Sequence, residues 1–164
     1  MKDFEDRLQE ALRRGRQRGL ANKAQHEQKQ WTEEELRRRH TEMRLELSEH
    51  IEQALEKFAH QVPGFLYEPV FGERGWGAAC YRDDLRLAPH AKGRGENLYS
   101  RLEITVAPFS AYHVVDLRAK GTVRNRELLE RRYHMPIENA SADQFQKRID
   151  TWILEYAELY AADS

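Results

Sequence analysis

The chain has 164 residues, of which 40% are hydrophobic and 34% are charged. This length corresponds to one domain, and the apolar content is enough for one core with a surplus of charge for exposed helices. The 27 basic and 28 acidic side chains balance to a formal net charge of −1, so overall charge does not favour nucleic acid or acidic lipid as a partner.

Composition also excludes several kinds of protein. The single cysteine, Cys80, rules out an intramolecular disulfide and a cysteine-based metal cluster, and its surroundings GAACY predict a buried structural thiol. The N-terminal residues MKDFEDRLQE lack the apolar segment of a signal peptide. No apolar run approaches the roughly 18 residues of a membrane span. We therefore expect a cytoplasmic protein with no membrane partner.

Residues 1–30 predict a charged helical arm, followed by a single domain over 31–164. Four apolar side chains share one face of a short amphipathic helix over 3–14: Phe4, Leu8, Ala11 and Leu12. Gly15 and Gly19 are expected to interrupt this helix within a basic run. Residues 21–30 are polar and predict a solvated helix or a mobile connection.

A second helix is predicted over 32–61. Thr32 and Glu35 form a capping box at its start, and Pro63 disfavours helix in the residue before it. The apolar side chains recur at helical spacing: Leu36, Met43, Leu47, Ile51, Leu55, Phe58 and Val62. Because this stripe is dense only from Met43 onward, we expect the N-terminal half to project or to pair with another helix.

Four strands are predicted over 65–72, 76–87, 97–107 and 111–124. Pro69 makes the first an edge strand or a broken one. The stretch Asn97–Val123 is the clearest hairpin, with Leu102, Ile104, Val115 and Leu117 on one face and Arg101, Glu103, Asp116 and Arg118 on the other. We expect the charged face to be the one that binds a ligand, if the sheet binds one.

The register of this hairpin is left open by the sequence. A four-residue loop at 108–111 places Ile104 opposite Val115, and a shift of two residues in either direction preserves the faces while bringing opposite charges across from each other. Residues 121–138 favour a strand or extended segment with a turn near Asn125 over a short helix beginning at Leu128.

The last helix is predicted over 142–161, with Ser141 and Gln144 as a second capping box. Its aromatic and aliphatic stripe is typical of a buried helix face: Phe145, Ile149, Trp152, Ile153, Tyr156, Leu159 and Tyr160. Together these elements predict an α+β fold: an antiparallel sheet of about four strands with the C-terminal helix packed on one face and long N-terminal helices.

The sequence contains no nucleophile elbow, P-loop, dinucleotide-binding fingerprint, zinc-ligand spacing or EF-hand loop, so we expect no cofactor. The seven histidines do not line one helix face, and we expect no metal site. The adjacent pair Asp83 and Asp84 points to opposite faces of a regular strand, which does not favour a paired acid and base.

Local charge supplies the remaining functional signal. Basic side chains gather in the 88–97 loop and in the run after Arg118, and the candidate ligand or nucleic-acid site is Lys92, Arg94, Arg118, Lys120, Arg124 and Arg126.

Three hypotheses follow. The first is a non-catalytic protein-interaction or scaffold protein whose arm binds a partner or a second copy. The second is a nucleic-acid or phosphate-ligand binder that uses the basic patches. The third is an enzyme of unknown class with a site near Trp76, Tyr81, Tyr99 and His113.

Overall fold

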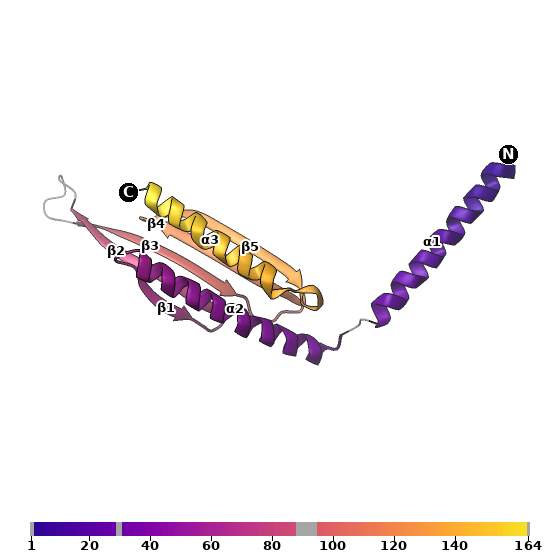
Figure 1. Cartoon of the computed structure of the whole chain (residues 1–164), viewed down its shortest axis with the longest axis horizontal. Coiled ribbons are helices and arrows are strands. Elements are labelled where there is room, and N and C mark those ends of the chain that lie inside the picture. Colours follow the sequence, from indigo (N-terminus) through magenta and orange to yellow (C-terminus); the bar gives the residue numbers. More distant parts are fainter. Residues whose placement is uncertain (1, 29–30, 88–94, 164) are drawn as a thin grey trace. The chain divides into compact units, whose positions relative to one another are not determined.

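The computed structural model of the chain describes residues 2–28, 31–87 and 95–163 (Figure 1). The chain divides into two compact units, Met1–Glu35 and Leu36–Ser164, and each is described here by itself. Among the described residues, none of the helices is both long enough and apolar enough to cross a membrane.

Helix α1 spans Lys2–Gln28 and is longer than expected. The sequence predicts an interruption at Gly15 and Gly19, and that prediction is wrong, because the helix continues through both residues. Glycine in a helix interior costs only about 1 kcal/mol relative to alanine, which weakens a helix without breaking it. The described side chains between residues 3 and 23 are all exposed.

Helix α2 spans Glu33–Gln61, close to the predicted range. The backbone N–H of Glu35 donates to Thr32 Oγ1 at 3.1 Å, which confirms the N-terminal cap. The expectation that the N-terminal half projects is wrong, because Leu36 and His40 are buried. His40 packs edge-on against Phe109, at 5.6 Å between ring centroids, so an aromatic contact takes the place of an aliphatic stripe.

Helix α3 spans Ala142–Ala162, as the aromatic stripe predicts. Ser141 occupies the N-cap position, but its side chain makes no capping hydrogen bond among the described residues, so the second predicted capping box is wrong. Gln144 instead accepts a hydrogen bond from Tyr133 Oη at 3.1 Å. Contact with the neighbouring strand therefore replaces the local contact that the sequence pattern suggests.

The described strands form one antiparallel sheet in which each strand pairs with its sequence neighbours, in the order β1-β2-β3-β4-β5. Their bounds are β1 Leu66–Val70, β2 Trp76–Leu87, β3 Gly95–Val106, β4 Val114–Val123 and β5 Arg126–Pro136. The α+β class is confirmed, and β1 is an edge strand as expected. The expected count of about four strands is corrected to five.

The fifth strand arises from the turn near Asn125. Arg124 and Asn125 have φ values of 45° and 70° and form a two-residue turn between β4 and β5. Asn125 is anchored from outside the turn, since its N–H donates to Tyr99 O and its Oδ1 accepts from Tyr99 N, both at 2.8 Å. These contacts favour the hairpin over the short helix.

The faces of the β3–β4 hairpin are as predicted, but its register is not. Ile104 pairs with Ala119, four residues from the first predicted register, and seven residues (107–113) connect the strands. Neither two-residue alternative matches this pairing. Glu103 nevertheless faces Lys120, so opposite charges lie directly across from each other.

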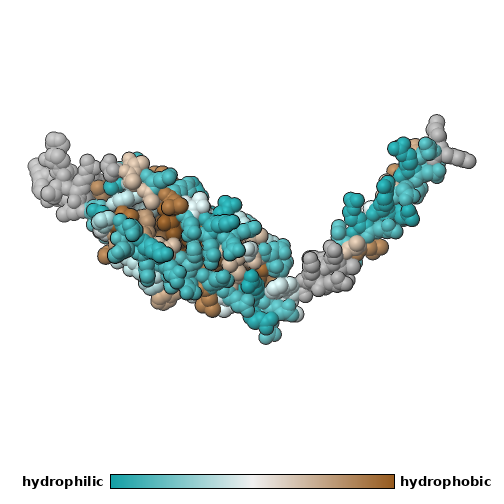
Figure 2. Space-filling view, in the orientation of Figure 1, coloured by the Kyte–Doolittle hydropathy of each residue, from teal (hydrophilic) through white to brown (hydrophobic). Residues whose placement is uncertain are grey.

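Helices α2 and α3 both lie against one face of the sheet, which makes a two-layer structure (Figure 1). Cys80 of β2 is buried, as predicted, and its Sγ donates to the carbonyl oxygen of Leu55 in α2 at 2.9 Å. Tyr156 of α3 donates to the carbonyl oxygen of Thr122 in β4 at 2.6 Å. Hydrophilic residues dominate the outward surface of the two helices (Figure 2).

Candidate functional site

Strand alternation gives the sheet two faces of different character. The face against α2 and α3 carries Leu102 and Ile104 of β3 and Leu117 of β4, all fully buried. The other face, which neither α2 nor α3 covers, carries charged side chains from β3, β4 and β5. We call it the open face, and we define it by the alternate residues Glu103, Thr105, Asp116, Arg118, Lys120, Glu130, Arg132 and His134.

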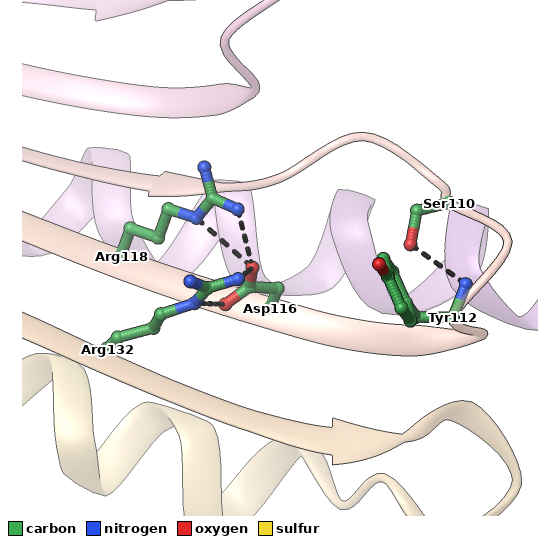
Figure 3. A network of polar contacts seen from close by, with 5 residues as sticks. All are labelled: Ser110, Tyr112, Asp116, Arg118 and Arg132. Atoms are coloured by element: carbon green, nitrogen blue, oxygen red, sulfur yellow. Dashed lines mark hydrogen bonds and ion pairs between the residues drawn. The ribbon is translucent and has the colours of Figure 1, made fainter.

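Arg118, Arg132 and Asp116 form an ion-pair cluster at the centre of the open face (Figure 3). Arg118 donates from Nε and Nη2 to Asp116 Oδ2, at 3.1 and 2.8 Å. Arg132 donates from Nε to Oδ1 at 3.0 Å and from Nη2 to Oδ2 at 2.8 Å. One carboxylate therefore holds two guanidinium groups in fixed positions.

Asp116 is the buried member of this cluster, with 5% of its surface exposed. Burial alone would raise the pKa of its carboxyl group, because a charged group is harder to desolvate. The hydrogen bonds from Arg132 and Arg118 outweigh burial, and the pKa lies below its ordinary value. Asp116 is therefore a carboxylate at neutral pH, and its two arginine partners keep about half or more of their side chains exposed, at 50% and 61%.

A second charged row crosses the sheet beside the cluster. Lys120 lies opposite Glu103 on one side and Glu130 on the other. Glu103 also accepts from Arg101 at 3.1 Å, and Arg101 donates to Glu68 at 2.6 Å. Burial alone would lower the pKa of Arg101, but its hydrogen bonds to the two glutamates raise it. Positive and negative groups thus alternate across this row.

The β3–β4 loop supplies an apolar end to the open face. Tyr112 is 87% exposed, and its backbone N–H donates to Ser110 Oγ at 3.3 Å (Figure 3). Phe109 is held from the helix side, since the guanidinium of Arg37 lies 4.4 Å from its ring centroid. Val114 begins β4 beside this loop.

The ion-pair cluster, the Lys120 row and the β3–β4 loop all contribute residues to one groove with a volume of about 1070 Å³. Its charged lining residues are Arg74, Arg118, Lys120, Arg131 and Arg132 with Glu73, Glu103, Asp116 and Glu130. Five positive and four negative groups leave a formal balance of 5 − 4 = +1, without counting His134. The groove therefore combines nearly balanced charge with an aromatic and apolar end.

The sequence-predicted basic residues divide between two places. Arg118 and Lys120 line the groove. Arg124 and Arg126 lie at the β4–β5 turn and both form ion pairs with Asp163 after α3, with Arg124 Nη1 at 3.3 Å from its carboxylate. Lys92 and Arg94 lie outside the described residues.

Asp116 is predicted on the charged face but is not among the six candidate site residues, and Arg132 belongs to neither prediction. The two-residue turn at 124–125, taken alone, places Arg118 opposite Arg131. A β-bulge inserts one extra residue, Leu128, between the pairs Thr122–Glu127 and Gly121–Leu129. This single-residue shift places Arg132 on the open face. We find no residue pattern in the sequence that predicts the bulge.

The residues suggested for an enzyme site also separate. Trp76 faces the helices, where the guanidinium of Arg44 lies 4.0 Å from its ring centroid. Tyr81 and Tyr99 occupy the alternate strand positions and lie on the other face.

Comparison of the chain with protein-family models, with curated proteins and with solved structures found no match.

Proposed function

We propose that this protein is a non-catalytic interaction protein that binds an extended polypeptide partner on the open face of its sheet. One observation carries the proposal: the face that α2 and α3 leave uncovered contains a groove of about 1070 Å³, with fixed charged groups at its centre and an aromatic end. The opposite face of the sheet builds the core under α2 and α3.

The chemistry of the groove favours a polypeptide. Protein interfaces are enriched in tyrosine and arginine, and the groove presents Tyr112 together with Arg118 and Arg132. A nucleic acid gains its affinity by releasing counterions from many phosphates, which requires a clear excess of positive charge. The balance of +1 is small for that purpose, whereas it suits a partner with a few acidic side chains beside apolar ones.

Unbiased peptide selection with site-specific crosslinking tests this proposal. Peptides would be selected from a random library against the full chain and then tested for capture by a photoreactive residue at Tyr112. A photoreactive residue at Leu154, an exposed position on the outward surface of α3, is the matched control. We expect crosslinking from position 112 only. Failure to enrich any peptide, or crosslinking mainly from position 154, contradicts the proposal.

A second interaction is favoured by the surface of α1. Phe4, Leu8 and Leu12 are exposed along one side of the helix. The acidic residues Asp3, Glu5, Asp6 and Glu10 precede a basic run, Arg13, Arg14, Arg16 and Arg18. Because antiparallel pairing sets the acidic half of one copy against the basic half of another, we infer that α1 associates with α1 of a second copy in this orientation.

Light scattering of the full chain and of a chain lacking residues 1–30 tests whether the arm mediates dimerisation. We expect a dimeric mass for the full chain and a monomeric mass without the arm. A variant with all four arginines of the basic run changed to glutamate, and one with all four acidic residues changed to lysine, should each be monomeric alone and dimeric when mixed. A monomeric full chain, or an unchanged dimer after truncation, contradicts the pairing.

A further inference from the structure

Arg118 and Arg132 occupy directly opposite positions on β4 and β5. Like charges directly across an antiparallel pair are destabilising. Asp116 offsets this repulsion, but a single arginine would suffice to neutralise one carboxylate. The second arginine leaves the cluster with a formal charge of 2 − 1 = +1, placed on an exposed surface. Departures from local pairing rules of this kind tend to fall at functional sites.

The cluster is also arranged to donate to something outside it. The hydrogen bonds to Asp116 use Nε and Nη2 of each guanidinium group. An arginine has five N–H donors, so Nη1 and the second proton of Nη2 remain directed away from Asp116. Because both side chains are at least half exposed, these donors can reach a ligand in the groove.

Charge and shape indicate which acceptor fits. A carboxylate carries one negative charge, which matches the +1 of the cluster, and its two oxygens match the fork of an arginine. A phosphate dianion would bring excess negative charge beside Glu103 and Glu130, which flank Lys120 in the next row. The surroundings therefore favour a carboxylate over a phosphate.

We propose that Arg118 and Arg132, held in place by Asp116, bind a carboxylate group of the partner polypeptide while an adjacent apolar residue packs on Tyr112 and Val114. This inference rests on the proposed polypeptide partner and specifies its chemistry. The carboxylate can belong to an acidic side chain or to a chain terminus, and the two sources present the same group. Asp116 acts as a positioning residue, because it orients the arginines without meeting the ligand.

NMR titrations of the full chain test the proposal. The observed signals are the Nε–Hε resonances of the arginines and the backbone amide resonances near Tyr112. The probes are acetate, acetyl-Leu-Glu-Leu-amide with only a side-chain carboxylate, acetyl-Leu-Gln-Leu with a free C-terminus, and neutral acetyl-Leu-Gln-Leu-amide. We expect acetate and at least one carboxylate peptide to shift the resonances of Arg118 and Arg132. The neutral peptide should leave them unchanged, and the stronger of the two peptides identifies the source.

Matched variants separate a specific site from general charge. Arg132→Gln and Lys147→Gln each remove one positive charge, the first from the groove and the second from an exposed position of α3 that does not line it. We expect about a tenfold loss of carboxylate-peptide affinity for the first and less than twofold for the second. Arg132→Lys keeps the charge but loses the two-pronged guanidinium geometry, and it should also weaken binding. Equal effects of Arg132→Gln and Lys147→Gln overturn the proposal.

Asp116→Asn tests the positioning role. It makes the cluster more positive, so a purely electrostatic site would bind acetate more tightly. We expect weaker binding, with the Nε–Hε resonances of both arginines moving together toward those of free arginine. Tighter binding overturns the role of Asp116.

The remaining outcomes distinguish this inference from the proposed function. If neutral and carboxylate peptides shift the amide resonances near Tyr112 equally, the carboxylate site is overturned. The proposal of a polypeptide-binding groove is then still supported. Tighter binding of inorganic phosphate than of acetate would overturn the carboxylate site, and shifts caused only by a single-stranded oligonucleotide would overturn both.

Discussion

Arg118 and Arg132 lie directly across from one another on β4 and β5, and both donate to the carboxylate of Asp116. Two like charges in this position repel, so the hairpin depends on a third, buried charge of opposite sign. The same arrangement that makes the open face a candidate binding site therefore contributes to the stability of the sheet.

Replacing Asp116 by asparagine should destabilise the fold. The variant leaves two arginines opposed without a shared carboxylate, and loss of charge-assisted hydrogen bonds at a buried acceptor costs about 1–3 kcal/mol. Urea unfolding at neutral pH measures the effect. Glu127→Gln is the control, because Glu127 is exposed and its contact with Lys120 is long, at 3.8 Å. A loss for Asp116→Asn no larger than that of the control contradicts the prediction.

The contribution of Asp116 should also depend on pH. Its pKa is lowered in the folded protein, so its stabilisation is fully present above the unfolded value of about 3.9 and is lost as pH falls through the folded value. We expect the difference in urea midpoint between the native chain and Asp116→Asn to be constant at neutral pH and to shrink below about pH 4. A difference that persists undiminished in acid excludes this linkage.

Glycine substitutions should have opposite effects in the sheet and in the arm. A Cβ at Gly121 would lie 2.8 Å from Tyr156 Cδ2 and 3.1 Å from Leu129 Cβ, whereas a Cβ at Gly15 meets nothing within 4 Å among the described residues. We expect Gly121→Ala to cost about 1–3 kcal/mol in urea unfolding. Gly15→Ala should slow amide hydrogen exchange in α1 about fivefold, since it stabilises a helix by about 1 kcal/mol. Unchanged exchange in α1 would show that the arm is not limited by its glycines.

His40 should make the fold sensitive to mild acid. Burial lowers the pKa of its imidazole more than a hydrogen bond to Ala107 raises it, and the nearby charge of Arg44 lowers it further. The unfolded chain therefore takes up this proton first, and stability falls as pH drops below about 6.5 toward the folded pKa. Between about pH 7.5 and 5.5, His40→Phe should lose less stability than the native chain. His60→Phe, at an exposed position in α2, is the control and should retain the native dependence.

Cys80 should be unreactive until the protein unfolds. Burial raises the pKa of its thiol to about 12, so almost no thiolate forms at neutral pH. A chromogenic disulfide reagent should label one thiol per chain in urea and react in native buffer only as fast as the protein opens. Rapid labelling of the native protein would contradict the burial of this side chain.

Local patterns in the sequence determine the elements and their faces. The apolar stripes of α2 and α3 follow from helical spacing, and the alternation along β3 and β4 separates Leu102 and Ile104 from Arg101 and Glu103. Each of these patterns involves residues within one element. They can therefore be recognised without knowing which elements pack against each other. The charged face of Asp116 and Arg118 follows from the same alternation.

The tertiary structure alone determined which residues meet. Alternation has a period of two, so it is unchanged by the four-residue shift that pairs Ile104 with Ala119 rather than Val115. That register sets Gly121 in β4 where the ring of Tyr156 packs from α3, a contact between distant segments. The bulge at Leu128 then shifts β5 by one residue and brings Arg132 beside Arg118 on the open face. The local sequence thus determines which face of the sheet each charged residue of β3 and β4 occupies. The convergence of two arginines on Asp116 depends on how the strands pair.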